Sequence, residues 1–443
     1  MAPDSVRIFT NFTSMIFASS ARVVSQQVHA VYHRLTYQAS LDARNVVVLG
    51  GSFAGLQLAK RLSQSLPSGF RVVLVEKHSH FNFAFNFPRY SVVGEERKAF
   101  IPYTNAFGRA PEGSWVLLRD TVSGVADGEV LLESGQKLSF AYLAIATGFQ
   151  QPLPARMVSF DRDEACTDLR VLRAKIKKAK RIAIVGGGPV GVQLSTDIKS
   201  AFPHKDVLLV HSRGRLLTGF GERLSNYVES KLERMGIQVV LRERPQILPT
   251  MAKGAEVGHG GIQESGLLQF QDGRQAEFDL IIPCTGATPN RGFLTSFIPS
   301  GFSSTTGRVL VRPTLQLDDD AHSHIFALSD IAESNGPKMG RTAMAQAGLV
   351  CENIVAMIEG TMLRDYEPKA IDGMLKLSLG LEDNVTYVAD GKGGDIMVPG
   401  KTKNLDLEVN QAWCPLPYTQ QSLGTHAPSR NTDVAQVTPP QRR

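Results

Sequence analysis

The sequence predicts an α/β fold with two Rossmann-like dinucleotide-binding domains, the second inserted in the first, and a smaller C-terminal α+β segment. The first observation is a β-branched run that closes on glycines at residues 46–56 and recurs at residues 182–192. The second is a hairpin that ends in a Thr-Gly pair, at Thr147-Gly148 and again at Thr285-Gly286. A single glycine-rich turn is weak evidence, whereas a module repeated in register indicates two nucleotide sites.

Length and composition place the chain among ordinary globular proteins. Its 443 residues suggest two or three domains, with 42% hydrophobic and 20% charged residues. The formal charge of +6 is mild at this length, and no dense Lys/Arg run is present, so nucleic acid is not an expected partner. Four cysteines are far apart and show no metal-ligand spacing, which indicates reduced thiols of an intracellular protein and no metal site: Cys166, Cys284, Cys351 and Cys414.

Residues 1–44 form a separate compositional zone. They contain four arginines, no lysine and two aspartates, and their apolar residues recur at helical spacing. This composition is typical of a mitochondrial presequence, and equally of a helix on an anionic membrane surface, which residues 5–36 would then contact. A helix docked on the protein's own core is the third alternative. Residues 425–443 are rich in Pro, Thr, Ser and Gln, and we expect a disordered tail there.

The first glycine motif follows a predicted buried strand at residues 45–49 and opens a helix. A helix N-terminus presents free N–H groups and a positive dipole end, which suit a diphosphate. Ser52 stands where the ideal pattern has its second glycine. The next strand ends in Glu76, whose carboxylate can accept both hydroxyls of an adenosine ribose. The predicted cofactor residues of this module are Gly50, Gly51, Ser52, Phe53, Ala54, Gly55, Glu76 and Gly148.

A strand near the other end of the module, Ile325–Leu328, leads into Ser329-Asp330. An aspartate there can bind a ribityl hydroxyl, a group that FAD has and nicotinamide cofactors lack. With the phrases at residues 50–55, 87–92, 98–103 and 337–339, the chain resembles the flavoproteins that have two dinucleotide-binding domains. That group includes apoptosis-inducing factor homologues, ferroptosis-suppressor-like proteins of fungal type and type II NADH dehydrogenases.

The resemblance implies roles for four residues. Arg89 would help to hold the FAD phosphates or the flavin side, Val122 would lie beside the adenine through its main chain, and Asp330 would bind the ribityl chain. Lys338 would lie near the isoalloxazine ring as the catalytic cation, stabilising negative charge on the reduced ring. One departure is Ser329, which stands where a glycine is usual.

The second glycine motif keeps the full spacing, with Gly186, Gly188 and Gly191. The strand that follows ends in His211-Ser212-Arg213, without the acid that an NAD-selective site normally carries. Since His211 and Arg213 can bind a 2′-phosphate, the sequence favours NADPH over NADH, or use of both. Gly286 closes this module, and we expect its backbone to pass close to the nicotinamide.

These observations predict the domain boundaries. An FAD-binding domain takes residues 45–155 and 288–345, an NAD(P)-binding domain takes 156–287, and a C-terminal domain with strands at 375–379 and 386–389 takes 346–424. Residues 45–165 contain no cysteine, which excludes the redox cysteine pair of a disulfide reductase.

The expected reaction is hydride transfer from NAD(P)H to FAD and then electron transfer to a second substrate. The resemblance makes a quinone the leading acceptor. A biosynthetic flavoenzyme acting on a small molecule or oxygen, and a redox-sensing cell-death effector with weak turnover, are the alternatives. The expected location is mitochondrial or peripheral to a membrane, with the cytoplasm as the alternative, and the expected state is a monomer or homodimer.

Overall fold

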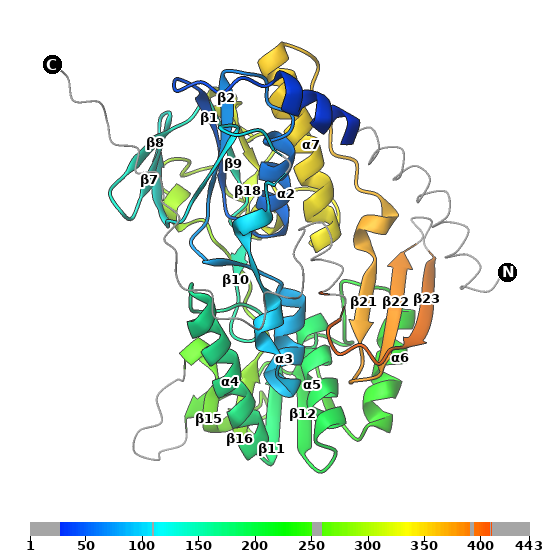
Figure 1. Cartoon of the computed structure of the whole chain (residues 1–443). Helices are drawn as coiled ribbons and strands as arrows, with labels where there is room; N and C mark the ends of the chain where they lie inside the picture. Colours follow the sequence, from blue (N-terminus) through cyan, green and yellow to red (C-terminus); the bar gives the residue numbers. More distant parts are fainter. Residues whose placement is uncertain (1–26, 109, 250–258, 390–393, 408, 410–443) are drawn as a thin grey trace.

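The computed structural model describes residues 27–108, 110–249, 259–389, 394–407 and 409, and it shows two open sheets with helices packed on them (Figure 1). The predicted α/β fold is confirmed. The first 26 residues of the predicted leader and the predicted tail lie outside the described residues. No helix in the described ranges is both long enough and apolar enough to cross a bilayer.

The first sheet is parallel and has the strand order β19-β9-β1-β2-β5. Its strands are β1 (Arg44–Leu49), β2 (Phe70–Val75), β5 (Trp115–Leu118), β9 (Tyr142–Ile145) and β19 (Ile325–Ala327). Strand β19 comes from beyond the second module, so this sheet is built from two separate stretches of chain. Alternate residues of β1 face opposite sides of the sheet, and the last four of them, Val46 to Leu49, are fully buried.

Each face of this sheet has its own cover. Helices α2 (Phe53–Leu62) and α7 (Gly340–Glu359) pack on the face to which Val46 and Val48 contribute. The opposite face, with Val47 and Leu49, packs on an antiparallel sheet of β6 (Val122–Ala126), β7 (Glu129–Leu132) and β8 (Lys137–Ser139). The β-branched residues of β1 therefore form a strand buried on both faces.

The second sheet has the order β13-β12-β11-β16-β15-β14, parallel up to β16 and antiparallel beyond it. Its strands are β11 (Arg181–Val185), β12 (Asp206–His211), β13 (Gln238–Leu241), β14 (Gln246–Pro249), β15 (Gln263–Gln269) and β16 (Gln275–Pro283). Its helices are α4 (Arg162–Lys178), α5 (Pro189–Ala201) and α6 (Glu222–Arg234). In Figure 1 this module lies below the first.

Two short chain crossings join the modules. Strands β10 (Phe149–Gln150) and β17 (Thr288–Pro289) pair antiparallel there. Thr147 Oγ1 donates to the Asn290 carbonyl at 3.0 Å, and Asn290 Nδ2 donates to the Thr147 carbonyl at 2.9 Å. The two crossing segments are therefore hydrogen-bonded to each other through side chains as well as through their strand pairing.

A C-terminal antiparallel sheet packs beside the second module (Figure 1). It contains β21 (Leu375–Ser378), β22 (Asp383–Ala389) and β23 (Asp395–Lys401). The sequence predicts the first two of these strands, whereas β23 carries Gly and Pro and was not expected. Leu377, Val385 and Tyr387 share one apolar cluster with the helices of the second module.

Helix α3 (Phe87–Val93) belongs by sequence to the first module, yet it packs against α4 and α5 of the second. Phe87 and Tyr90 are fully buried there. The remaining short strands are β3 (His80–Asn82), β4 (Phe100–Pro102), β18 (Val309–Leu310) and β20 (Ala332–Glu333). The 3-10 turns are η1 (Ala84–Asn86), η2 (Glu96–Ala99), η3 (Tyr103–Asn105), η4 (His259–Gly261), η5 (Gly292–Leu294), η6 (Asp320–His322), η7 (Ser329–Ile331) and η8 (Ala370–Gly373).

Candidate active site

The turn from β1 into α2 requires glycine at two places. Gly50 has φ +95°, and a Cβ there would lie 2.7 Å from the Ala146 carbonyl oxygen. A Cβ on Gly55 would lie 1.7 Å from the Gly50 carbonyl oxygen, so only glycine lets the helix approach the strand tip this closely. The helix begins without a side-chain cap, which leaves its first N–H groups free for a ligand.

Ser52 fits this turn without strain. Its φ of −82° and ψ of −158° nearly match those of Gly188, the glycine at the same place in the second motif, with φ −82° and ψ −177°. A Cβ on Gly188 would meet no atom within 4 Å. The second glycine of the pattern is therefore not required by the backbone in this chain.

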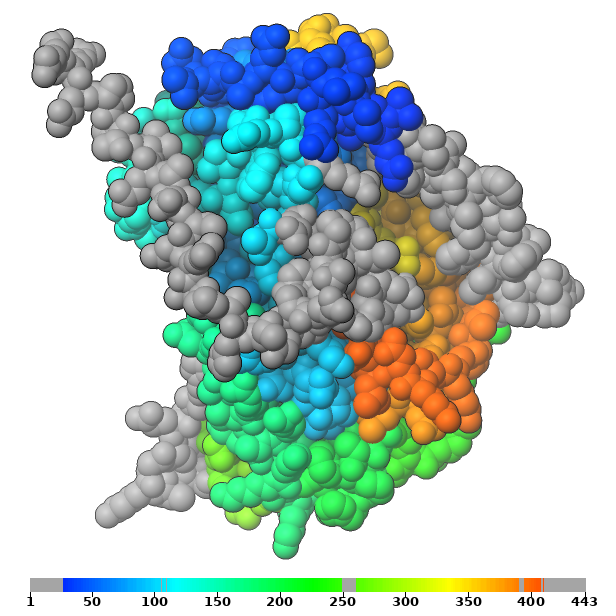
Figure 2. All heavy atoms as spheres, in the orientation of Figure 1, coloured from blue at the N-terminus to red at the C-terminus, as the bar shows by residue number. Residues whose placement is uncertain are grey.

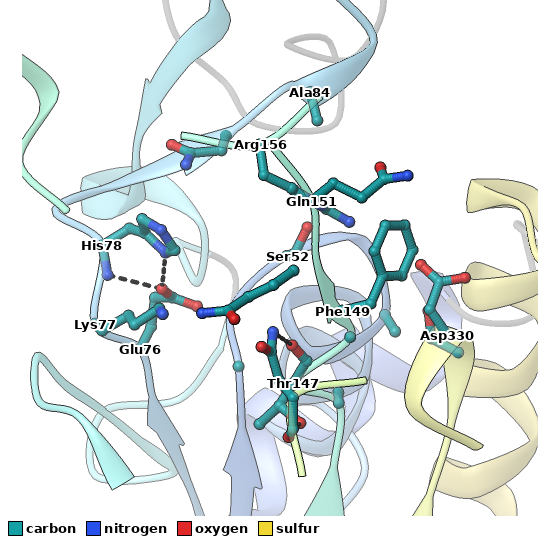
Figure 3. Close-up of a pocket in the computed structure, with 18 of the residues that line it drawn as sticks. Ser52, Glu76, Lys77, His78, Ala84, Thr147, Phe149, Gln151, Arg156 and Asp330 are labelled. Atoms are coloured by element: carbon teal, nitrogen blue, oxygen red, sulfur yellow. Dashed lines mark hydrogen bonds and ion pairs between the residues drawn. The ribbon is translucent and has the colours of Figure 1, made fainter. Parts of the chain in front are cut away.

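A large cleft opens along this turn between the two modules. Its volume is about 1240 Å³, more than the ~300–1,000 Å³ typical of pockets for drug-sized ligands. The close-up in Figure 3 shows Glu76 on one side and Asp330 on the other. The predicted cofactor residues that line the cleft are Gly50, Ser52, Phe53, Ala54, Glu76, Val122, Gly148, Gly286, Asp330 and Lys338.

Glu76 is held as an anion at the tip of β2. Its carboxylate accepts the Gly51 N–H, the His78 N–H at 2.7 Å and a contact from His78 Nδ1 at 2.5 Å. Burial raises the pKa of this carboxyl, but the bonds and charge of His78 and the Gly51 N–H outweigh it, and the net pKa is lowered. An ionised carboxylate in this position can accept hydroxyl groups of a ribose.

Asp330 and Lys338 lie at the opposite end of the cleft. Lys338 Nζ donates to the Ala332 carbonyl at 2.8 Å and to the carbonyl and hydroxyl of Ser334, both at 3.0 Å. Burial, with Arg308 nearby, lowers the pKa of Lys338 to about 8. Burial also raises the pKa of Asp330, although Arg156 and Lys338 oppose the shift.

Ser329 keeps the backbone shape of the glycine that it replaces. Its φ is +70°, in the left-handed region, and its N–H donates to Gln346 Oε1 at 2.6 Å. The turn that presents Asp330 to the cleft is therefore formed with a serine, at some cost in backbone strain.

Arg156 is a cleft residue that sequence reasoning missed. It lines the cavity, its guanidinium lies 4.9 Å from the Phe149 ring centre, and Asp330 and Glu76 both raise its pKa against the lowering effect of burial. It is the only basic residue between 149 and 161. That isolated cation, directly after the first Thr-Gly pair, is the signal that could have revealed it.

Four neighbouring aromatic rings form a second feature not found from the sequence. Phe53 lies 5.0, 5.7 and 4.9 Å from Phe81, Phe83 and Phe85, measured between ring centres. Phe53 and Phe85 line the cleft, and Phe85 is 51% exposed. We call these four rings the aromatic rim. Met339 and Gly340, next to Lys338, line the same end of the cleft.

The structure does not bring Arg89 to the cleft, where the prediction that it helps to hold the FAD phosphates or the flavin side requires it. Arg89 is 1% exposed, lies outside the cleft lining, and pairs with Asp197 of α5 at 2.8 Å. Its Nη2 also donates to the Gly380 carbonyl at 2.8 Å. Because α3 packs its arginine-bearing face on the second module, this cation joins three chain segments and does not face the cofactor.

The second glycine motif forms a turn of the same shape. Gly186 has φ +131°, and a Cβ on Gly191 would lie 1.8 Å from the Gly186 carbonyl oxygen. The Gly187 N–H donates to His211 Nδ1 at 3.1 Å, just as the Gly51 N–H donates to Glu76. His211 and Arg213 therefore lie at the strand tip of a second cradle, while Gly286 lies on the first cleft.

Comparison with known proteins agrees with this architecture. The family model described as pyridine nucleotide-disulphide oxidoreductase matches residues 44–347. Fe-regulated protein 8 of Mycosarcoma maydis is 31% identical over 421 residues, covering 87% of this chain and 97% of that protein. Ferroptosis suppressor protein 1 of Homo sapiens is 30% identical over 374 residues, covering 84% and 95%. The predicted resemblance to ferroptosis-suppressor-like flavoproteins is confirmed.

Solved structures show the same fold. The sulfide:quinone oxidoreductase of Aquifex aeolicus superposes with a TM-score of 0.65 at 15% identity, over 84% of this chain and 90% of that one. The cleft also fits FAD, since it combines an uncapped helix N-terminus, a ribose-accepting carboxylate and a second carboxylate near a buried lysine. The chain therefore belongs to the pyridine nucleotide-disulphide oxidoreductase family, as a flavoprotein oxidoreductase that uses FAD and NAD(P)H.

Proposed function

We propose that this chain is an NAD(P)H:quinone-type oxidoreductase, in which NAD(P)H at the second cradle reduces FAD in the cleft and a quinone then takes the electrons. The observation that carries the acceptor is the part of the aromatic rim that lines the cleft, half-buried Phe53 and exposed Phe85, because such rings suit a flat apolar acceptor. The sulfide:quinone oxidoreductase of Aquifex aeolicus has the same fold, which shows that this fold can serve a quinone acceptor.

Disulfide chemistry does not fit the described cleft. Cys166 is buried in α4 and Cys351 is buried in α7, and neither they nor Cys284 line the cavity. Burial raises the pKa of the Cys351 thiol to about 12 and that of Cys166 to about 11, so both are poor nucleophiles. An acceptor that diffuses to the flavin is therefore a better fit than a protein dithiol at these positions.

Bound FAD would supply a ring that accepts hydride and releases electrons. We infer that Glu76 accepts the adenosine ribose and that Val122 lies against the adenine. Asp330 would accept a ribityl hydroxyl. We also infer that Arg156, which lines the cleft and interacts electrostatically with both carboxylates, would contact the diphosphate.

Lys338 acts in this proposal as a fixed positive charge. Its three donor bonds all end on Ala332 and Ser334, so the ammonium is held in place by the protein. A cation fixed in this way favours negative charge that develops on a nearby ring without having to reorganise.

We also propose that the helix over residues 27–36 contacts a membrane surface. Val28, Val31, Tyr32 and Leu35 are between 62% and 80% exposed and share one helical face, in the spacing i, i+3, i+4 and i+7. The opposite face attaches the helix, since His33 Nε2 lies 2.7 Å from the Leu66 carbonyl oxygen. Figure 2 shows this helix at the periphery of the molecule, in dark blue. A mitochondrial or other membrane location and the oligomeric state stay predictions.

The experiment is an anaerobic titration of the purified flavoprotein. Addition of NADPH or NADH should bleach the flavin absorbance, and a soluble quinone should restore it. Phe85→Ala should raise the KM for the quinone while the nucleotide still bleaches the flavin at the wild-type rate. Phe160→Ala serves as the control, because this exposed ring lies near Lys77, at the Glu76 end of the cleft. Bleaching that no quinone reverses, or an unchanged KM in Phe85→Ala, would contradict the proposal.

A further inference from the structure

The two cradles can be compared directly because one chain contains both. In the first, the N–H of the second motif residue, Gly51, donates to the carboxylate of Glu76. In the second, the N–H of Gly187 donates to the ring of His211. The strand-end residues therefore occupy equivalent positions. In the first cradle that position holds an acceptor carboxylate, and in the second it holds an imidazole.

The hydrogen bond fixes the state of this imidazole. His211 Nδ1 accepts the Gly187 N–H, so Nδ1 carries no proton and the neutral ring carries its proton on Nε2. Burial lowers the pKa of His211, and the charge of Arg213 lowers it further, which keeps the ring neutral at pH 7. Nε2 is buried and has no hydrogen-bond partner among the residues that the structure describes. His211 is thus a neutral ring where NAD-selective sites have an acid.

Two arginines follow neighbouring strands of the sheet near this ring, Arg213 after β12 and Arg242 after β13. The backbone N–H of Arg242 donates to the backbone carbonyl of Arg213 at 3.0 Å, so the ends of the two strands are held together. The Arg242 guanidinium packs against Gly214, the residue that follows Arg213. Its nitrogens lie 3.4 Å from the position that a Cβ on Gly214 would take. Both side chains are exposed.

Neither guanidinium has a hydrogen bond or ion pair within the described part of the chain. The neighbouring Arg215, by contrast, donates to the carbonyls of Phe220 and Thr218. The nearest acid in sequence, Glu243, accepts the Gln271 N–H at 3.1 Å with one carboxylate oxygen. Arg213 and Arg242 therefore remain available for an external anion.

We propose that Arg213 and Arg242 bind the 2′-phosphate of NADPH beside the neutral His211, so that the second cradle selects NADPH over NADH. This inference rests on the proposed function, because it needs the second cradle to hold the nicotinamide nucleotide. The dianionic phosphate would accept from the two guanidinium groups, beside a neutral imidazole that does not repel it. Arg242 is the new member of this set: it lies 29 residues beyond Arg213 in sequence and is brought beside it by the pairing of β12 with β13.

The test is calorimetric binding of 2′,5′-ADP and 5′-AMP to the FAD-loaded full chain. We expect 2′,5′-ADP to bind tighter by on the order of 10–100-fold, as charge-assisted bonds imply. Arg213→Gln and Arg242→Gln should each remove most of this difference and leave the affinity for 5′-AMP unchanged. His211→Glu should reverse the preference, because its carboxylate would repel the phosphate.

Arg244→Gln is the matched control, since Arg244 is an exposed arginine two residues beyond Arg242. It should leave both affinities as they are. Equal affinity of the wild type for the two probes, or an equal loss in Arg244→Gln and Arg242→Gln, would overturn the inference. The proposed function is tested separately. It still holds if NADH or NADPH bleaches the flavin, and failure of both nucleotides to bleach it would overturn the function itself.

Discussion

The variant Arg89→Met tests whether this arginine joins the modules or holds the flavin. Arg89 donates to Asp197 Oδ2 and to the Gly380 carbonyl, each at 2.8 Å. The substitution removes both bonds and leaves the Asp197 side chain, which is 0% exposed, without its cation. Removal of one partner from a buried ion pair costs about 3–5 kcal/mol, because an uncompensated charge remains. We expect the free energy of unfolding to fall by this amount at pH 8.

The loss should be smaller at pH 5. Burial raises the pKa of Asp197 to about 6, although Arg89 lowers it, so loss of Arg89 moves this pKa higher still. A carboxyl with that pKa is protonated at pH 5 and no longer leaves a buried charge. The sign follows from linkage: a folded-state pKa above the ordinary 3.8 gives stability that is present at low pH and declines as the pH rises through 6.

The double variant Arg89→Met/Asp197→Leu separates the two roles. If the pair is structural, removal of both charges should return the urea midpoint close to that of the wild type, since apolar replacement of a buried pair is often neutral. The flavin-to-protein ratio, measured by absorbance after dialysis, should match the wild type in the double variant. A double variant that is stable but lacks flavin would refute this reasoning and restore Arg89 as an FAD ligand.

Four further predictions address the cleft and the N-terminal helix. Ser329→Gly should raise stability by about 0.5–1 kcal/mol in urea unfolding, because it relieves a left-handed serine; lower stability would contradict the strain argument. The rate of flavin reduction, followed by stopped flow, should fall as the pH rises through about 8, where Lys338 loses its proton, and Lys338→Arg should flatten this profile. Arg156→Gln should weaken FAD binding by roughly 10–100-fold, measured as flavin released on dilution; full retention would remove Arg156 from the site. The double variant Val31→Glu/Leu35→Glu should reduce the fraction of protein that sediments with anionic liposomes, since each apolar side chain contributes about 2 kcal/mol when it is buried in the membrane surface. The flavin content should stay constant, and unchanged sedimentation would exclude this helix face as the membrane contact.

The cradles could be predicted from sequence because their requirements are local. A left-handed residue after the strand and a close helix–strand contact both demand glycine, at Gly50 and Gly55 and again at Gly186 and Gly191. The carboxylate of Glu76 lies one strand later, at a distance set by the βαβ unit itself. These constraints act within about 30 residues, so a short motif with fixed spacing is enough to reveal them in the sequence.

The contacts that the sequence did not reveal are long-range. Arg89 meets Asp197 and Gly380, which lie 108 and 291 residues away in the chain. No periodic pattern in the sequence near Arg89 distinguishes an arginine that is buried in another module from one that faces a cofactor. Arg156 was missed for a related reason, since only the folded cleft brings it near Glu76 and Asp330 together.

The duplicated cradle also shows why one backbone can serve two nucleotides. Both strand-end groups have lowered pKa values, that of Glu76 through His78 and the Gly51 N–H despite burial, and that of His211 through burial. The same direction has opposite consequences for charge: a lowered pKa keeps a carboxyl ionised and an imidazole neutral. Glu76 is thereby an anionic acceptor that favours free ribose hydroxyls and disfavours a 2′-phosphate, and His211 is a neutral ring that tolerates one. On this argument the glycine turns provide the shared diphosphate geometry, and the choice between nucleotides depends on the side chains at the strand tip, which can change without any change in the fold.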